Sequence, residues 1–165
     1  MRQHHGFSLI ELLIVVAIIL VIAAIAVPNL LRAKVASNEA SAGASMRTLA
    51  TAELTYSLSY PTTGYTALAN LGGPANCTPS AATACIIDSL LSTGSKSGYT
   101  FNATASSSGG ATMDQYLTTG VPQLLNVTGT KGFCEIEDHV IMYITPAKGP
   151  ATRGVCDGGT YSPVQ

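Results

Sequence analysis

The sequence predicts an α+β fold in which one long N-terminal helix packs against a small antiparallel β-sheet. Three observations lead to this prediction. Residues 12–27 are an unbroken run of Leu, Ile, Val and Ala, and no proline stands between Pro28 and Pro61. Strand-like segments occur only beyond residue 98. A head rich in Ser, Thr, Gly and Ala therefore follows a single hydrophobic helix.

The composition argues against several functional classes. Only 10% of the residues are charged and the mean hydropathy is +0.33, which is too apolar for an ordinary soluble domain. The net charge is −1 and the eight Lys and Arg are scattered singly, so no nucleic-acid partner is expected. The histidines and cysteines show no spacing typical of a zinc site. Neither a metal nor another cofactor is expected.

The apolar run has the properties of a membrane-spanning helix. About twenty apolar residues are needed to cross a bilayer, and residues 12–31 are twenty uncharged positions. A core helix of a soluble domain is a poor alternative because the run is apolar on all sides. Glu11 is the only charged residue between Phe7 and Leu31. An ionisable side chain next to a membrane span is by default a functional one, although an interfacial carboxylate that merely reaches water is the alternative.

A conventional secretory signal peptide is the competing explanation of the N-terminus. Arg2 would supply its basic region, and Ala24-Ile25-Ala26 has the small-x-small pattern of a cleavage site. Cleavage after Ala26 would release a secreted binding domain. A signal peptide gives Glu11 no role, and its cleavage would leave Pro28 beside the new N-terminus.

The helix is expected to continue well beyond the membrane. Residues 29–60 contain no further proline and are rich in good helix formers. A helix over residues 7–60 would be roughly 80 Å long, more than twice the hydrocarbon thickness. We expect the head to pack on a stripe of the second half, which Glu39 and Glu53 interrupt. The stripe consists of Val35, Ala42, Met46, Leu49 and Tyr56.

The sequence of the head predicts a loop region followed by strands. Residues 61–98 are rich in Gly, Pro, Ser and Thr, with a short helix suggested around residues 86–92. Strand patterns cover residues 99–103, 113–118, 133–136 and 140–144. The polar tripeptide 137–139 suggests a hairpin between the last two.

Catalytic residues are not expected. The acidic cluster is Glu135, Glu137 and Asp138, where strand alternation sends the first two to one face. A solvated turn explains this cluster better than a converging set of acids and bases. No nucleophile stands with a base, so the sequence predicts no enzymatic activity.

The segment Gly6-Phe7-Ser8-Leu9-Ile10-Glu11-Leu12 resembles the processing site of type IV pilins and of the pseudopilins of type II secretion systems. The resemblance continues to Ala24-Ile25-Ala26-Val27-Pro28 and covers about the first thirty residues. It implies that a membrane-embedded prepilin peptidase cuts after Gly6 and methylates the new amine of Phe7. It also implies that Glu11 pairs with the Phe7 amine of a neighbouring subunit, and that Pro28 stands where such helices are commonly kinked.

The four cysteines all follow the apolar run, so export would place them together in an oxidising compartment. A bond between Cys134 and Cys156 is predicted because it would fasten a Gly-rich tail of little hydrophobic content. The resemblance supports it, since many pilins fasten their C-terminal region in this way. Pairing Cys134 with Cys156 leaves Cys77 to bond with Cys85, which is nearby in the sequence. This is one of the three connectivities that four cysteines allow.

The sequence thus predicts a structural subunit of a type IV pilus, which polymerises from the inner membrane into a helical filament for adhesion or twitching motility. The alternative is a major pseudopilin of a type II secretion system, which Val27-Pro28-Asn29-Leu30 resembles; the longer head with two disulfides suits a pilin better. The expected regions are a leader (1–6), an assembly helix (7–31), its exposed half (32–60), a loop region (61–98), the sheet (99–146) and a disulfide-fastened tail (147–165).

The resemblance also implies the partners and the location. The expected partners are further copies of the chain, the prepilin peptidase, an inner-membrane assembly platform and, before assembly, membrane lipid. The precursor would cross the inner membrane once with a periplasmic head. The mature subunit would then belong to an extracellular pilus or a periplasmic pseudopilus.

Overall fold

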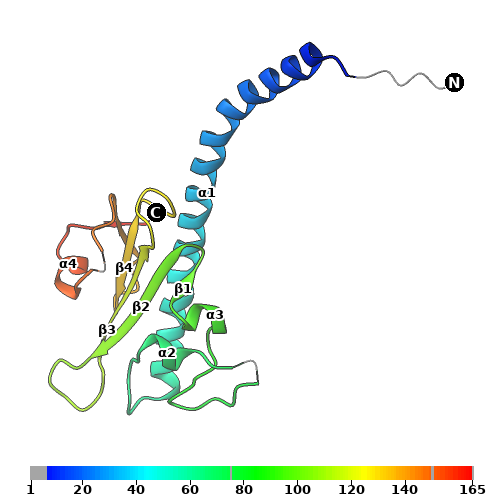
Figure 1. Cartoon of the computed structure of the whole chain (residues 1–165). Coiled ribbons are helices and arrows are strands. Elements are labelled where there is room, and N and C mark those ends of the chain that lie inside the picture. The colour runs from blue at the N-terminus through cyan, green and yellow to red at the C-terminus, as the bar shows by residue number, and fades with distance from the viewer. Residues whose placement is uncertain (1–6, 75, 150, 165) are drawn as a thin grey trace. The chain divides into compact units, whose positions relative to one another are not determined.

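The structure is a computed structural model that describes residues 7–74, 76–149 and 151–164. The chain divides into two units, the first ending at Lys34 and the second, the head, beginning at Val35. Helix α1 (Leu9–Ser59) runs through this boundary and contains Pro28 (Figure 1). The predicted helix over residues 7–60 is therefore confirmed to within two residues at either end.

The second half of α1 presents one buried face to the head. Its buried residues recur every three or four positions, which is the spacing of one helical face. They are Ala42, Gly43, Ser45, Met46, Leu49, Ala52, Glu53 and Tyr56. The predicted stripe is confirmed except at Val35, which is only half-buried. Glu53, which the pattern treats as an interruption, is completely buried.

Three short elements follow α1 along the chain, before the longer strands of the sheet. They are α2 (Leu68–Leu71), α3 (Ser89–Ser92) and β1 (Ser95–Lys96). Asp88 caps α3, because its side chain accepts a hydrogen bond of 2.9 Å from the Leu91 amide. The short helix suggested for residues 86–92 is therefore present in its second half. Neither α2 nor β1 was predicted.

The sheet is a six-stranded antiparallel meander in the order β1-β2-β3-β4-β5-β6. The five strands after β1 are β2 (Tyr99–Ser106), β3 (Gln115–Pro122), β4 (Gly132–Ile136), β5 (Met142–Ile144) and β6 (Ser162–Pro163). The hairpin predicted around residues 137–139 is confirmed as the β4–β5 connection. Both outer strands are two residues long, and they carry Lys96 and Pro163, residue types that discourage further strand pairing.

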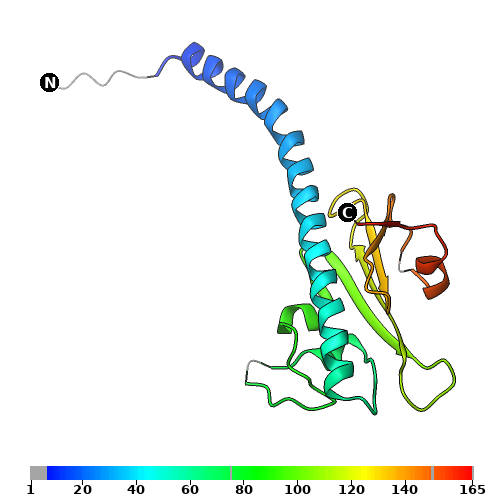
Figure 2. The same cartoon turned by 180° about the vertical axis from the view of Figure 1, so that it is seen from behind.

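Both faces of the sheet are covered. On one face, the second half of α1 packs against the aromatic side chains of Tyr99, Phe101 and Phe133. On the opposite face lies α4 (Arg153–Asp157), as Figures 1 and 2 show from two sides. The core on that face consists of Cys134, Ile136, Cys156 and Tyr161. The tail therefore has more apolar content than the sequence suggested, since it supplies two of these four residues.

Candidate assembly site

The apolar side chains of the first unit are uncovered. Every large apolar side chain from Phe7 to Leu31 is at least 46% exposed. An 18-residue window of α1 has a mean hydropathy of 3.3 with no residue buried, and α1 is the one described helix long and apolar enough to cross a membrane. A helix that is hydrophobic all round belongs inside a membrane or inside an assembly. The first unit therefore needs a covering that the folded monomer does not provide.

Phe7 and Glu11 lie at the start of this helix. Gly6, the predicted cleavage residue, lies outside the described residues, as does the rest of the predicted leader. The Phe7 side chain is 78% exposed just before α1 begins. Glu11 is exposed in the first helical turn, which a 3.2 Å hydrogen bond from the Leu12 amide to the Ser8 carbonyl closes. A carboxylate in this position interacts favourably with the helix dipole and is open to a cationic partner.

Polar contacts fasten the first turns of the head's helix to the loop that joins β3 and β4. Asn38 donates a 2.9 Å hydrogen bond to the Thr128 carbonyl. Glu39 accepts hydrogen bonds from the amide and the hydroxyl of Thr130, at 2.8 and 2.6 Å, and lies 3.5 Å from the Lys131 ammonium. Burial raises the pKa of Glu39, but these hydrogen bonds and the Lys131 charge outweigh it and leave the pKa below its ordinary value. Glu39 therefore stays ionised as an attachment point.

Farther along the head, α1 and the sheet enclose two buried carboxyl groups. Glu53 on α1 accepts a 3.1 Å hydrogen bond from the Thr66 amide, and Glu135 on β4 accepts one of 2.7 Å from the Tyr116 hydroxyl. One oxygen of each group, Glu53 Oε1 and Glu135 Oε2, has no hydrogen-bond partner among the described residues. Burial is the main cause that raises the pKa of each to about 7. The charge of Glu135 adds to the shift of Glu53, and the charge of Asp138 adds to that of Glu135.

This arrangement corrects the expectation of a solvated acidic turn. Glu135 is completely buried. Glu137 is half-buried and forms a two-point ion pair with Arg153, whose hydrogen bond lowers the pKa of Glu137. Asp138 is exposed, as expected. The Tyr116 hydroxyl also lies 3.0 Å from His139 Nδ1.

The predicted disulfide pairing is confirmed. Cys134 on β4 is bonded to Cys156 on α4, and Cys77 is bonded to Cys85 within the loop region. The first bond joins residues 22 positions apart and lies in the core of the sheet face opposite α1. The second closes a segment of eight positions. The two bonds thus secure the tail and the loop region independently of each other.

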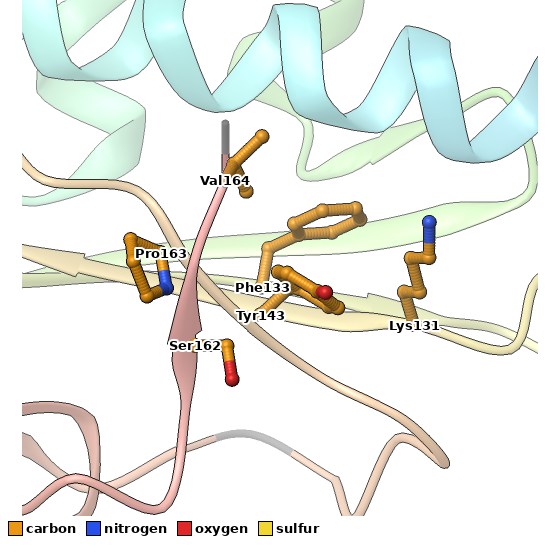
Figure 3. A pocket seen from close by; sticks show the side chains of 6 residues that line it. All are labelled: Lys131, Phe133, Tyr143, Ser162, Pro163 and Val164. Carbon is orange, nitrogen blue, oxygen red and sulfur yellow. The ribbon is translucent and has the colours of Figure 1, made fainter.

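Two open hollows flank Val164 near the end of the chain. One, of about 410 Å³, is drawn in Figure 3 and is lined by Lys131, Phe133, Tyr143, Ser162, Pro163 and Val164. Its only charged group is engaged, since Lys131 Nζ lies 5.4 Å from the centre of the Tyr143 ring and 3.5 Å from Glu39. The other, of about 670 Å³, lies between α1 and the β4–β5 turn. Neither brings a nucleophile and a base together, and within the described ranges no group of three His, Cys, Asp or Glu is placed to hold a metal ion.

Comparison with known proteins gives matches at the N-terminus. The family described as "Prokaryotic N-terminal methylation motif" matches residues 1–27. The chain is 56% identical over 39 residues to the type IV wide pilus major component PilA4 of Thermus thermophilus, covering 24% of this chain and 30% of that protein. It is 43% identical over 54 residues to the type IV major pilin protein PilA of Myxococcus xanthus, covering 33% of this chain and 24% of the relative.

These matches cover less than a third of the length of each relative, and no solved structure matches the chain. Both relatives are named as structural components of pili, not as enzymes. The long apolar helix and the six-stranded antiparallel sheet fit the α+β fold of pilins.

Proposed function

We propose that this chain, which carries the N-terminal methylation motif of the type IV pilin-like proteins, is a structural subunit of a type IV pilus. The observation that carries the proposal is the uncovered apolar half of α1 with a single carboxylate, Glu11, in its first turn. A membrane covers such a surface in the precursor. In a filament, the same surface is covered by the helices of other copies.

Moving from lipid into a filament exchanges one apolar environment for another. The hydrophobic effect therefore contributes little to the preference of the helix for the filament over the bilayer. Close packing and polar pairs decide that preference. Glu11 is the one charged group available in this stretch, and an unpaired buried charge costs several kcal/mol. The positively charged amine of a neighbouring copy's Phe7 would neutralise it. Because each copy offers one amine and one carboxylate, this pair fixes the axial register of successive subunits.

The amine exists only after processing. We infer that a prepilin peptidase removes residues 1–6, cutting after Gly6, and methylates Phe7. A glycine before the cut lets an extended backbone approach the enzyme without a side chain in the way. Removal of the leader also removes Arg2, the one Lys or Arg before the apolar run. The Phe7 amine is then the positive charge at that end of the helix, and an assembly platform would add the subunit from the membrane to the filament.

The test is the N-terminal sequence of the mature protein together with imaging of cells that lack only this gene. Mature protein that begins at a methylated Phe7, and loss of long surface filaments, are the expected results. A mature terminus at Val27 would instead show a secreted domain released by signal peptidase. A methylated Phe7 with intact filaments and lost protein secretion would identify a pseudopilin, the second candidate, which the tetrapeptide Val27–Leu30 favours.

A further inference from the structure

The head exposes a concentrated group of apolar side chains outside its core. Three of its exposed large apolar side chains fall within four consecutive positions: Leu124 is 60% exposed, Leu125 44% and Val127 62%. They lie on the loop of residues 123–131 between β3 and β4, which we call the β3–β4 loop. No residue from 115 to 130 is charged. An exposed apolar group of this kind is a recognised mark of a protein or membrane contact.

Several backbone groups of the β3–β4 loop are paired within the loop itself. The amides of Val127 and Thr128 donate to the Leu124 carbonyl, at 3.1 and 2.9 Å, and the Asn126 amide donates to the Gly129 carbonyl at 2.9 Å. The Thr128 hydroxyl accepts from the Leu124 amide at 3.1 Å. This internal pairing lowers the penalty for moving those backbone groups from water to a less polar region.

The loop is also held firmly in place. The Tyr99 hydroxyl, beneath it, donates a 2.9 Å hydrogen bond to the Lys131 carbonyl. A Cβ on Gly129 would lie 2.1 Å from that hydroxyl oxygen, so the loop and the Tyr99 ring are in tight contact. The hydrogen bonds from Asn38 and to Glu39 fasten the same loop to the first turns of the head's helix. The apolar side chains are therefore presented by a rigid support.

These attachments place the loop at the end of the head where the chain arrives from the apolar segment. Asn38 stands seven residues after Leu31, which is about 10 Å along a helix. The polar headgroup layer on each side of a bilayer is roughly 5–8 Å thick. A bilayer whose hydrocarbon ends at Leu31 therefore has its surface within a few ångströms of Asn38. The separation of about 10 Å is an upper bound that follows from the continuity of α1 between the two residues, and it holds for any orientation of the head.

We propose that the β3–β4 loop inserts Leu124, Leu125 and Val127 into the interfacial region of the same bilayer that holds residues 12–31. The partner is lipid, at the boundary between headgroups and acyl chains. This inference rests on the proposed function, because it requires a membrane-anchored precursor. Lipid is favoured over a second copy because Asn38, to which the loop is bonded, follows the anchor by seven residues, and because residues 123–130 have no charge to specify a protein partner.

The absence of tryptophan from the chain gives a direct test. The full chain with Val127→Trp is reconstituted into phosphatidylcholine–phosphatidylglycerol vesicles whose acyl chains carry bromine at a chosen depth. The expected results are a blue-shifted emission and several-fold stronger quenching by bromines near the headgroups than by bromines at the bilayer centre. Leu124→Trp should behave in the same way, which protects the test against local misfolding of one variant.

Two further single-tryptophan variants serve as matched controls. Leu58→Trp, at the other end of the head's helix and 74% exposed in the wild type, should be neither blue-shifted nor quenched. Ile19→Trp should be quenched most strongly by bromines at the bilayer centre, which tests the membrane span itself. If Ile19→Trp is quenched but Val127→Trp and Leu124→Trp resemble Leu58→Trp, the inference fails while the proposed function stands. A blue shift at residue 127 without bromine quenching would place the loop against another copy and would also overturn it.

Discussion

The Tyr116 hydroxyl donates a 2.7 Å hydrogen bond to a carboxyl oxygen of Glu135, inside the layer between α1 and the sheet. This bond stabilises the ionised form of Glu135, but burial outweighs it and raises the pKa to about 7. Glu53, on the helix side of the same layer, has a pKa raised to about 7 for the same main reason. The head therefore contains two carboxyl groups whose ionisation opposes folding.

The head should lose stability as the pH rises from about 4.5 to about 7. The folded pKa of each group lies above the ordinary value of 4.5, so the folded state binds more protons than the unfolded state within that window. The loss is at most roughly 3 kcal/mol per group. Glu53→Gln and Glu135→Gln should each flatten the dependence, which thermal unfolding of the detergent-solubilised chain at several pH values would measure.

The matched control is Glu39→Gln. The pKa of Glu39 is lowered, so its contribution is present above pH 4.5 and disappears as the pH falls. This variant should lose stability mainly at neutral pH. An unchanged pH profile in the Glu53→Gln/Glu135→Gln double variant would contradict the assignment of the effect to this buried pair.

Gly129→Ala should destabilise the head by about 1–3 kcal/mol, the usual range for overpacking. The added methyl group would lie 2.1 Å from the Tyr99 hydroxyl oxygen and would displace a ring that also bonds to Lys131. Gly154→Ala is the control, because a Cβ there has no atom within 4 Å. Equal unfolding temperatures for both variants would show that Tyr99 has room to move.

Cys156→Ser should loosen the tail before it affects the helix. Opening the Cys134–Cys156 loop costs about 3 kcal/mol in the chain-entropy estimate. Amide hydrogen exchange should accelerate in α4 and β6 and stay slow in the second half of α1. Cys77→Ser, which opens the other disulfide, should affect only the segment around residues 77–85. Uniform acceleration throughout the head in Cys156→Ser would mean that the tail and helix unfold as one unit.

The sequence predicts the parts of this fold that have strong local patterns. The limits of α1, the central strands and the β4–β5 hairpin follow from apolar periodicity and from proline positions, and Glu11 is conspicuous as a charge in an apolar run. Elements α2, β1, α4 and β6 have two to five residues each, too few to show a period, and they depend on tertiary pairing. The burial of Glu135 was missed because all five residues of β4 are buried, which requires knowing that both faces of the sheet are covered.

The ion pair of Glu137 with Arg153 was missed for a related reason. Its partners stand 16 positions apart and meet where α4, joined to β4 by the Cys134–Cys156 bond, lies against the sheet. The predicted disulfide contained this information in principle. A tail fastened at Cys156 places Arg153, three residues earlier, near the end of β4, where Glu137 is the nearest acidic residue after the strand.

Gly6→Leu should trap an unprocessed precursor in the membrane. Under the proposed processing, the peptidase would approach the backbone closely at the cut, and a branched side chain would obstruct that approach. Mass spectrometry of the membrane fraction should find the chain with residues 1–6 attached and Phe7 unmethylated. Mature protein that still begins at Phe7 in this variant would contradict the prediction.

Glu11→Val should separate membrane insertion from assembly. Removal of the charge makes the apolar segment more hydrophobic, so insertion should be equal or better, and cleavage after Gly6 should persist. Filaments should fail, since each incoming Phe7 amine would be buried unpaired at a cost of several kcal/mol. The measurement compares cleaved protein, membrane-held protein and sheared filaments in one strain.

Glu11→Asp provides the matched control for charge, because it keeps the carboxylate and shortens the side chain. Partial filament yield is expected from it. Full filament yield from processed Glu11→Val protein would leave Glu11 as an interfacial carboxylate without a role in register.

Under the proposed function, the brevity of β1 and β6 affects how subunits behave in the membrane before assembly. Subunits that share a membrane surface are crowded in two dimensions, with their heads free to collide many times before any of them polymerises. A long free strand at the rim of each head would make such collisions adhesive and would turn the waiting pool into cross-β aggregates. Edge strands of two residues, which carry Lys96 and Pro163, leave almost no template for pairing between heads. In the proposed pilus subunit, such short edge strands would keep neighbouring heads from pairing with one another before assembly.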